Sequence, residues 1–369
     1  MLLMKIEREQ LLRPLQSVSG IVEKRHTLPI LSNVLIETEG DALTLLATDI
    51  EIQIRTRSTG NISAAQPAAL TVAARKLQDI LRALPEGQEV SLDADDRKLT
   101  VRCGKSRFTL QTLPAQDYPR MQVAEGETVK LSLTQRKLKR LLSLVQYSMA
   151  QQDIRYYLNG LLLAVGSEEL RLVATDGHRL AYVSEALPGV TDKLDVILPR
   201  KTVLELSRQL ADTDDPVDIE LGGNQARLRF GSVELISKLI DGKFPDYERV
   251  IPKDHPKEIM LQRSSFLPAL QRAAILTNEK FKGVRVVLSS GLLKLISSNA
   301  EQEEAQEELE VDYTGDALDI GFNVSYLLDV LGNVAGDTLS LRLNDGNSSA
   351  LITLPGTDGF KYVVMPMRV

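Results

Sequence analysis

Apolar residues recur with a helical period in six segments of this chain. Residues 134–150 show the period most clearly, because apolar side chains fall at i, i+3, i+4, i+7 and i+11 of one stripe: Leu138, Leu141, Leu142, Val145 and Met149. Thr134, at the start of this segment, is the predicted N-cap. Comparable patterns predict helices over residues 7–18, 75–84, 201–210, 264–276 and 324–334.

Short strand-like runs lie between the predicted helices. They cover residues 69–72, 90–92, 99–103, 107–110, 196–198, 217–221, 226–230 and 349–354. Clusters of Gly, Pro, Asn and Asp separate them, for example at residues 85–87, 222–224 and 344–347. Because strands outnumber helices and many connections are hairpin-short, we predict an α+β fold with largely antiparallel sheets, in which each repeat carries two helices.

Three patterns repeat along the chain in the same order. The segment LTLLATDIEIQI at 43–54 returns as LRLVATDGHRLAYV at 170–183 and, more diverged, at 293–309. The second pattern is AARKLQDIL, LPRKTVLEL and FNVSYLLDV, and the third is TLPAQDYP, KLIDGKFPDY and VVMP. The copies of the first pattern begin 127 and then 123 residues apart. This spacing exceeds the 20 to 50 residues of a solenoid repeat and is the size of a whole domain. We therefore predict three domains of one fold, over residues 1–127, 128–253 and 254–369.

Composition narrows the class of protein. The chain has 369 residues, of which 43% are hydrophobic and 25% charged, as in an ordinary globular protein. The single cysteine, Cys103, excludes an internal disulfide and a cysteine-rich zinc site, and it suits a reducing cytoplasm. No apolar run approaches the roughly 20 residues of a membrane span, and the N-terminus lacks the layout of a signal peptide. We expect a cytoplasmic protein.

Basic residues gather on the predicted helices, whereas acidic residues gather in strands, turns and residues 301–310. Opposite the apolar stripe of residues 134–150 lie four cations with no acidic residue before Asp153: Arg136, Lys137, Lys139 and Arg140. Such a face attracts phosphate even though the whole chain has a net charge of −6. The alternative is an ordinary solvated helix face, and the cation-free helix at 324–334 does not favour a phosphate-binding role.

The sequence contains no complete catalytic or metal-binding motif. Gly104-Lys105-Ser106 lacks the earlier glycine of a phosphate-binding loop, whose position holds Leu99. None of the three histidines has the spacing of a metal site: His26, His178 and His255. A solvated hairpin turn is the better interpretation of three neighbouring acids, Asp93, Asp95 and Asp96. We predict a protein that is not an enzyme and that needs neither a metal nor a cofactor.

Seven segments resemble the β subunit of bacterial DNA polymerase III, the sliding-clamp family. They are RYYLNG at 155–160, ATDGHRL at 174–180, DGKFPDYERV at 241–250, NEKFKGVR at 278–285, EQEEA at 301–305, GFNVSYLLDVL at 321–331 and YVVMPMR at 362–368. The resemblance spans essentially the whole chain. It implies a head-to-tail homodimer in which each subunit forms half of a ring around duplex DNA, with helices lining the hole. It also implies three kinds of protein partner in the bacterial cytoplasm: an ATP-driven clamp loader, the replicative polymerase, and other polymerases and repair proteins.

The resemblance assigns residues to DNA binding, to partner binding and to the dimer seam. For DNA it points to Arg25, Arg75, Gln152, Tyr156 and Tyr157, beside the helix cations Arg136, Lys137, Lys139, Arg140, Arg200 and Lys201. Ahead of Arg25 the chain departs from the family, because residues 21–24 replace a more glycine-rich stretch. The partner-binding cleft would use Arg155, Leu158, Thr175, Gly177, His178, Arg179, Leu180, Pro245, Arg249, Val250, Asn323, Tyr326, Ser349, Val363, Val364, Met365, Pro366, Met367 and Arg368.

The terminal VVMPMR also suits an adaptable groove by its chemistry, because thioethers are flexible and pack against varied side chains. The alternative is that Met365 and Met367 complete the core of the last strand.

The dimer seam implied by the family places Phe108 and Leu110 against Ile275 and Leu276, and Lys76, Lys105 and Arg107 opposite Glu301, Glu303 and Glu304. Exposed ion pairs contribute little each, so the four apolar residues would supply most of the stability. Two rival functions are an enzyme acting on phosphates and an adaptor unrelated to DNA.

Overall fold

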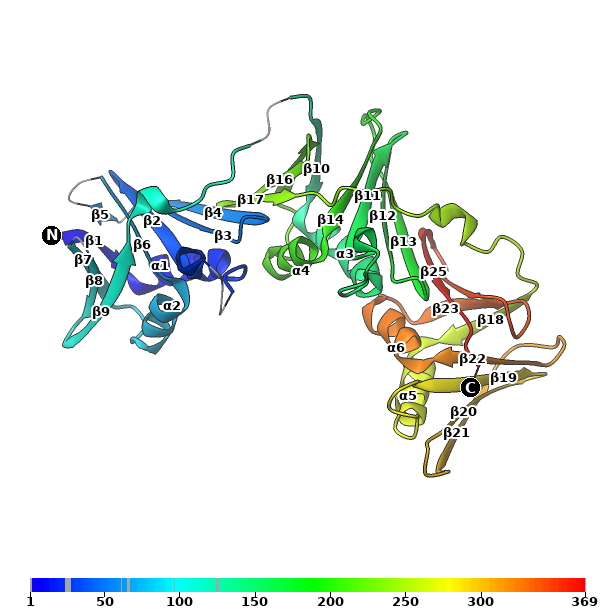
Figure 1. Ribbon diagram of the computed structural model, residues 1–369. Coiled ribbons are helices and arrows are strands. Elements are labelled where there is room, and N and C mark those ends of the chain that lie inside the picture. Colours follow the sequence, from blue (N-terminus) through cyan, green and yellow to red (C-terminus); the bar gives the residue numbers. More distant parts are fainter. Residues whose placement is uncertain are drawn as a thin grey trace. The chain divides into compact units, whose positions relative to one another are not determined.

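The computed structural model describes residues 2–23, 28–60, 62–64, 67–95, 97–123 and 126–368 (Figure 1). By its internal contacts the chain divides into two compact units. The first comprises Met1–Lys139 and Leu204–Leu239, and the second comprises Arg140–Val203 and Ile240–Val369. Each unit is built on its own antiparallel sheets.

In the first unit, the described residues form one sheet of thirteen strands in the order β10-β15-β16-β17-β4-β3-β2-β6-β9-β8-β7-β1-β5. The strands are β1 Leu2–Glu7, β2 Asn33–Glu39, β3 Ala42–Thr48, β4 Ile52–Thr59, β5 Ser63–Ala64, β6 Ala68–Ala73, β7 Glu89–Asp95, β8 Lys98–Cys103, β9 Ser106–Leu113, β10 Val129–Thr134, β15 Pro216–Gly222, β16 Gln225–Phe230 and β17 Val233–Lys238. Strands distant in sequence meet at β17 and β4, where Leu235 lies opposite Ile54.

Two helices cover part of this sheet, α1 (Arg8–Ser19) and α2 (Ala74–Ala83). Their apolar residues are fully buried, for example Leu11 and Leu15 of α1 and Leu77 of α2. Short 3-10 turns at Pro29–Ser32 and Ala115–Asp117 complete the unit. The helices are amphipathic because their apolar side chains recur at a 3.6-residue period and face the sheet.

The second unit has two antiparallel sheets within the described residues. The larger has the order β14-β11-β12-β13-β25-β24-β23-β18 and the smaller the order β21-β20-β19-β22. The strands are β11 Gly160–Gly166, β12 Glu169–Thr175, β13 Arg179–Ala186, β14 Leu194–Pro199, β18 Lys257–Gln262, β19 Gly283–Ser289, β20 Leu292–Ser298, β21 Glu304–Glu310, β22 Leu318–Asn323, β23 Thr338–Leu343, β24 Ala350–Leu354 and β25 Thr357–Val364. The strands β13 and β25 lie side by side although about 180 positions separate them (Figure 1).

The remaining helices are α3 (Gln135–Val145), α4 (Arg200–Gln209), α5 (Arg263–Ala274) and α6 (Val324–Asn333). Single 3-10 turns occur at Gln146–Ser148, Tyr156–Leu158 and Tyr247–Arg249. No helix among the described residues is both long and apolar enough to cross a membrane.

The predicted elements agree with this fold, with one exception. Each predicted strand overlaps an observed one, and five of the predicted helices end within two residues of their observed bounds. The helix predicted over 134–150 is wrong at its C-terminal end, because α3 stops at Val145 and a 3-10 turn follows, after which Met149 is extended at φ −63° and ψ 137°. Thr134 is confirmed as the cap, since its hydroxyl accepts a hydrogen bond from the Lys137 amide at 3.2 Å. The three repeated segments form equivalent hairpins, β3–β4, β12–β13 and β20–β21.

Candidate functional site

An apolar pocket of about 190 Å³ opens in the second unit, where the segment after β17 crosses the larger sheet. All of the predicted peptide-binding residues between positions 155 and 180 line this pocket. The lining residues are Arg155, Tyr157, Leu158, Thr175, Gly177, His178, Arg179, Leu180, Pro245, Tyr247, Val250, Val363 and Met365. Eleven of the predicted peptide-binding residues are therefore among those that line the pocket.

The floor of the pocket is a rigid part of the sheet. Leu180 of β13 lies directly opposite Val363 of β25, and Val363 in turn lies opposite Leu351 of β24. These three side chains belong to one buried cluster that also contains Phe244 and Tyr247. Close packing of this kind holds a cavity open in one shape, because the side chains beneath it cannot collapse into the space.

One rim is the turn between β12 and β13. The Asp176 carboxylate accepts hydrogen bonds from the amides of His178 and Arg179 at 2.9 and 3.1 Å, and Thr175 Oγ1 donates to the Arg179 carbonyl at 2.6 Å. Gly177 has φ +89°, and a Cβ there would lie 3.0 Å from the Arg155 guanidinium. Glycine is therefore required both for the backbone conformation and for the close approach of Arg155.

Arg155 forms the opposite part of the rim. Its guanidinium donates to both oxygens of Asp153, at 3.0 and 2.9 Å, and to the Asp176 carbonyl at 3.3 Å. The hydrogen bonds from Arg155 lower the pKa of Asp153 to about 2. The side chain is thus held in place at the mouth of the pocket while remaining 45% exposed.

Arg179 has a second, structural role beside its predicted place in the cleft. Part of it lines the pocket, but its guanidinium donates to Asp176 at 3.1 Å, to Asp329 of α6 at 2.5 Å and to the Tyr147 carbonyl at 2.6 Å. It also lies 4.4 Å from the centre of the Tyr326 ring. Burial alone would lower the pKa of Arg179, but Tyr362, Asp329 and Asp176 raise it. These contacts make Arg179 a link between β13 and α6.

The C-terminal segment forms the last wall. After β25, the Met365 amide donates to the His178 carbonyl at 2.9 Å and the Met367 amide donates to the Gly321 carbonyl at 2.8 Å. Met365 is 46% exposed, whereas Val363 and Val364 are buried. The alternative that Met365 completes the core of the last strand is therefore wrong, and this thioether stands at the edge of the pocket.

Other predicted cleft residues lie outside the lining. Asn323 caps α6 by accepting from the Ser325 amide at 2.9 Å, and Arg249 pairs with Asp246 at 2.7 Å. The others outside the lining are Tyr326, Ser349, Val364, Pro366, Met367 and Arg368. Tyr247 was missed and Tyr157 had been assigned to DNA alone. The proline and aromatics around Tyr247 in FPDYERV were the available signal.

The cationic face of α3 is less free than the sequence predicted. Arg136 donates to Asp212 at 2.9 Å and to Asp214 at 3.0 Å, so the prediction of a face without acids is wrong. The hydrogen bond that Arg136 donates to Asp212, together with the negative charge of Asp214, raises the pKa of Arg136. These acids follow α4, far from residues 134–150 in sequence, and no local pattern could reveal them. Arg140 is exposed and Lys139 is half-buried.

The other predicted DNA contacts are scattered over both units. Arg75 donates to the Val22 carbonyl at 2.7 Å and Arg200 donates to the Met149 carbonyl at 3.2 Å, so each has a structural partner. Gln152 has φ +55° in the loop after α3, and Tyr156 is 58% exposed in the same loop. Lys201 is half-buried. Arg25 lies outside the described residues.

The predicted seam residues occupy strand edges and a helix end. Within the described residues, β21 is an edge strand, and residues 106–111 of β9 pair only with β8. Ile275, at the end of α5, is 75% exposed. Phe108, Leu110 and Leu276 are half-buried, whereas the charged members are exposed: Lys76, Lys105, Arg107, Glu301, Glu303 and Glu304.

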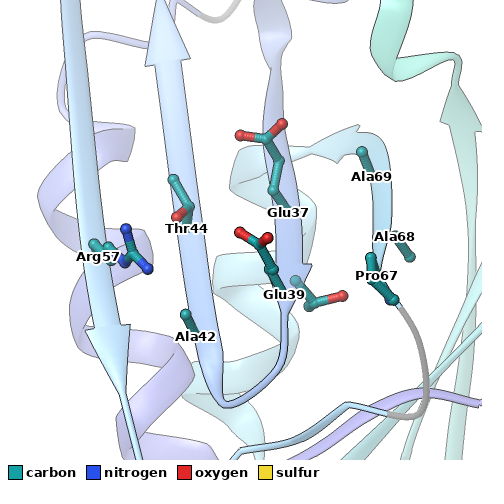
Figure 2. A pocket seen from close by; sticks show the side chains of 9 residues that line it. Glu37, Glu39, Ala42, Thr44, Arg57, Pro67, Ala68 and Ala69 are labelled. Carbon is teal, nitrogen blue, oxygen red and sulfur yellow. The ribbon is translucent and has the colours of Figure 1, made fainter.

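A hollow of about 430 Å³ on the first unit has a different character (Figure 2). Figure 2 shows Glu37 and Glu39 on β2, Thr44 on β3 and Arg57 on β4, beside the segment 67–69. Glu37 is already paired with Arg120 at 2.6 Å. Alternating charges on adjacent strands are typical of a solvated sheet face. No predicted site residue lines this hollow.

Comparison with known proteins assigns the family. Three family models match in order: the N-terminal domain of the DNA polymerase III beta subunit over residues 2–122, its central domain over 132–246 and its C-terminal domain over 248–368. The chain belongs to the family of beta sliding clamps. It is 50% identical to the Beta sliding clamp of Pseudomonas putida over 368 residues and 46% identical to that of Escherichia coli over 364 residues, with 99% of each chain covered.

Solved structures of beta sliding clamps have the same fold. The DNA polymerase III subunit beta from Pseudomonas aeruginosa superimposes with a TM-score of 0.94 at 49% identity, over 100% of both chains. A Caulobacter crescentus beta sliding clamp gives 0.94 at 40% identity, over 100% of this chain and 99% of the other. The predicted family, the α+β fold of three clamp domains and the non-catalytic sliding-clamp function in DNA replication are thereby confirmed.

Proposed function

We propose that this beta sliding clamp closes as a head-to-tail homodimer around duplex DNA and holds linear segments of its protein partners in the apolar pocket of the second unit. The observation that carries the second part is the pocket itself. Its floor is the buried pair Leu180 and Val363, and its edge is the exposed thioether of Met365. An open apolar pocket with a few polar groups at its rim suits a peptide that docks one or two large side chains.

The DNA contacts in this proposal are weak and carry no sequence information. Arg140 and Lys139 would meet phosphates, together with the other predicted cations on α2, α3 and α4. Non-specific contacts of this kind have dissociation constants of roughly 10⁻⁴ to 10⁻⁶ M at physiological salt. A closed ring does not depend on them, because it cannot leave the duplex sideways, and loose contacts allow sliding.

The ring would consist of six domains, three from each subunit. The domains of one subunit would cover residues 1–127, 128–253 and 254–369. The seam would join the edge of β9 in one subunit to the edge of β21 in the other. Unpaired strand edges are templates for pairing with another chain, and Ile275 supplies an apolar contact beside one of them. A heterologous contact forms a closed ring when its rotation closes, which two subunits would achieve here.

The partners in this proposal are the clamp loader, the replicative polymerase, and other polymerases and repair proteins. We place the protein in the bacterial cytoplasm, because the relatives named Beta sliding clamp are bacterial. One adaptable pocket can serve such varied partners because flexible thioethers such as Met365 repack around different side chains.

The test is retention on nicked circular DNA after loading with a clamp loader and ATP. We expect the protein to remain on the circle through gel filtration at high salt and to be lost when the circle is linearised. Equal retention on circular and linear DNA would show ordinary contact binding and would refute the ring. A variant lacking residues 365–369 is the matched control, because it should stay on the circle and fail to bind a partner peptide.

A further inference from the structure

A second hollow, of about 440 Å³, lies beside the apolar pocket in the same unit. Tyr247 lines both cavities. The segment that carries Tyr247 crosses the sheet between them, so that Pro245 and Val250 face the apolar pocket and Pro252 and Lys253 face the second hollow. The two cavities are therefore neighbours across one short segment of chain.

The register of the sheet sets the distance between them. In the β13–β25 pair, Leu180 lies opposite Val363 at the apolar pocket, and Tyr182 lies opposite Lys361 at the second hollow. These two pairs are two residues apart and point to the same face. At about 3.3 to 3.4 Å per residue they are separated by roughly 7 Å. An extended peptide needs only about two residues to cover that distance.

The second hollow carries uncompensated positive charge. The Lys361 ammonium lies 5.3 Å from the centre of the Tyr182 ring, and Lys253 is exposed. No acidic side chain in the described part of the chain forms an ion pair with either lysine. The other charged groups there already have partners, because Arg342 pairs with Glu258 at 3.0 Å and Glu248 with Arg171 at 3.4 Å.

The hollow also offers an aromatic wall. The rings of Tyr182 and Tyr247 are 5.8 Å apart with an angle of 34° between them. The Tyr247 hydroxyl accepts a hydrogen bond from Arg171 at 3.0 Å, which holds the ring in place. Two ammonium groups without a carboxylate partner, beside a fixed aromatic pair, match an acidic peptide segment: its aliphatic side-chain carbons can pack on the rings while its carboxylates meet the lysines.

We infer that this hollow binds an acidic segment that flanks the pocket-bound peptide of a partner protein, with Lys253 and Lys361 as the contacting residues. The inference rests on the proposed peptide-binding function of the apolar pocket. The second hollow would lengthen the peptide-binding site. It would favour partners that carry Asp or Glu about two residues from the apolar side chain that fills the pocket.

The test compares labelled peptides by fluorescence anisotropy on the full chain. A core hexapeptide with leucine and phenylalanine side chains fills the apolar pocket. Extended versions add Gly-Asp-Asp at either end, and neutral versions add Gly-Asn-Asn. Exposed ion pairs have modest strength, so we expect one of the two acidic extensions to bind about three- to ten-fold more tightly than its neutral counterpart at low salt.

The double variant Lys253→Gln with Lys361→Gln should remove that advantage and leave the affinity for the core peptide unchanged. Lys193→Gln, which changes an exposed lysine at a different hollow of the same unit, should preserve it. If neither acidic extension binds more tightly, or the double variant keeps the difference, the inference is wrong while the pocket stands. If no peptide binds at all, the proposed pocket function fails and takes the inference with it.

Discussion

Replacing Arg179 by methionine separates two roles of this residue, contact with a peptide and support of the fold. The side chain is only 10% exposed and its guanidinium joins β13 to α6 through Asp176 and Asp329. Methionine keeps an apolar stem of similar length but cannot donate a hydrogen bond. If the role is support, the variant should destabilise the strand that carries the residue.

The expected loss follows from the groups left behind. The Tyr147 carbonyl loses its charged donor, the 17%-exposed Asp176 carboxylate loses its charged partner while keeping two backbone amide donors, and the Tyr326 ring loses a cation at 4.4 Å. Removing one partner of a buried pair costs about 3 to 5 kcal/mol. Asp329 is 42% exposed and can be hydrated, so we expect the low end, a loss of about 3 kcal/mol in the free energy of opening β13 locally.

Hydrogen exchange of the β13 amides is the suitable assay, because a chain of several domains does not have a single unfolding free energy. A loss of about 3 kcal/mol should make these amides exchange roughly 100-fold faster. Arg155→Met is the matched control, since Arg155 also lines the pocket but is itself 45% exposed, so that water can replace its contacts with Asp153 and the Asp176 carbonyl. Its exchange should stay within a few-fold of the parent. Equal exchange in both variants would refute the supporting role of Arg179.

Three further outcomes are expected. Ile275→Ala with Leu276→Ala should yield monomers by light scattering, because Ile275 is the most exposed apolar residue near the seam, and a dimeric double variant would contradict that seam. Deleting residues 365–369 should abolish binding of a partner peptide but leave the dimer intact, and unchanged peptide affinity would count against the pocket. Arg155 lowers the pKa of Asp153 from 3.8 to about 2, so the carboxylate's contribution to stability is present above about pH 4 and is lost as the pH falls through 2. The Asp153 carboxyl resonance should titrate near pH 2 in NMR, and a midpoint near 4 would disprove that pairing.

The sequence by itself determined the elements and their repetition. The stripe from Leu138 to Val145 predicted α3, because helical periodicity is a property of neighbouring residues that survives in any tertiary setting. The repeated segments beginning near Ala47 and Ala174 predicted equivalent hairpins, and the structure has them as β3–β4 and β12–β13. Most of the pocket lining was also predicted, although on the strength of family resemblance and not of local pattern.

Only the tertiary structure decided which charges are paired and which aromatic residues meet. Arg136 finds Asp212 some 76 positions away, and Arg179 finds Asp329 across 150 positions. Tyr247 enters the pocket because its segment folds back over the sheet. No sequence period encodes such encounters, since they depend on how the sheets and helices pack. The edge position of β21 and the neighbouring places of Lys253 and Lys361 beside the pocket likewise became visible only once the strands were paired.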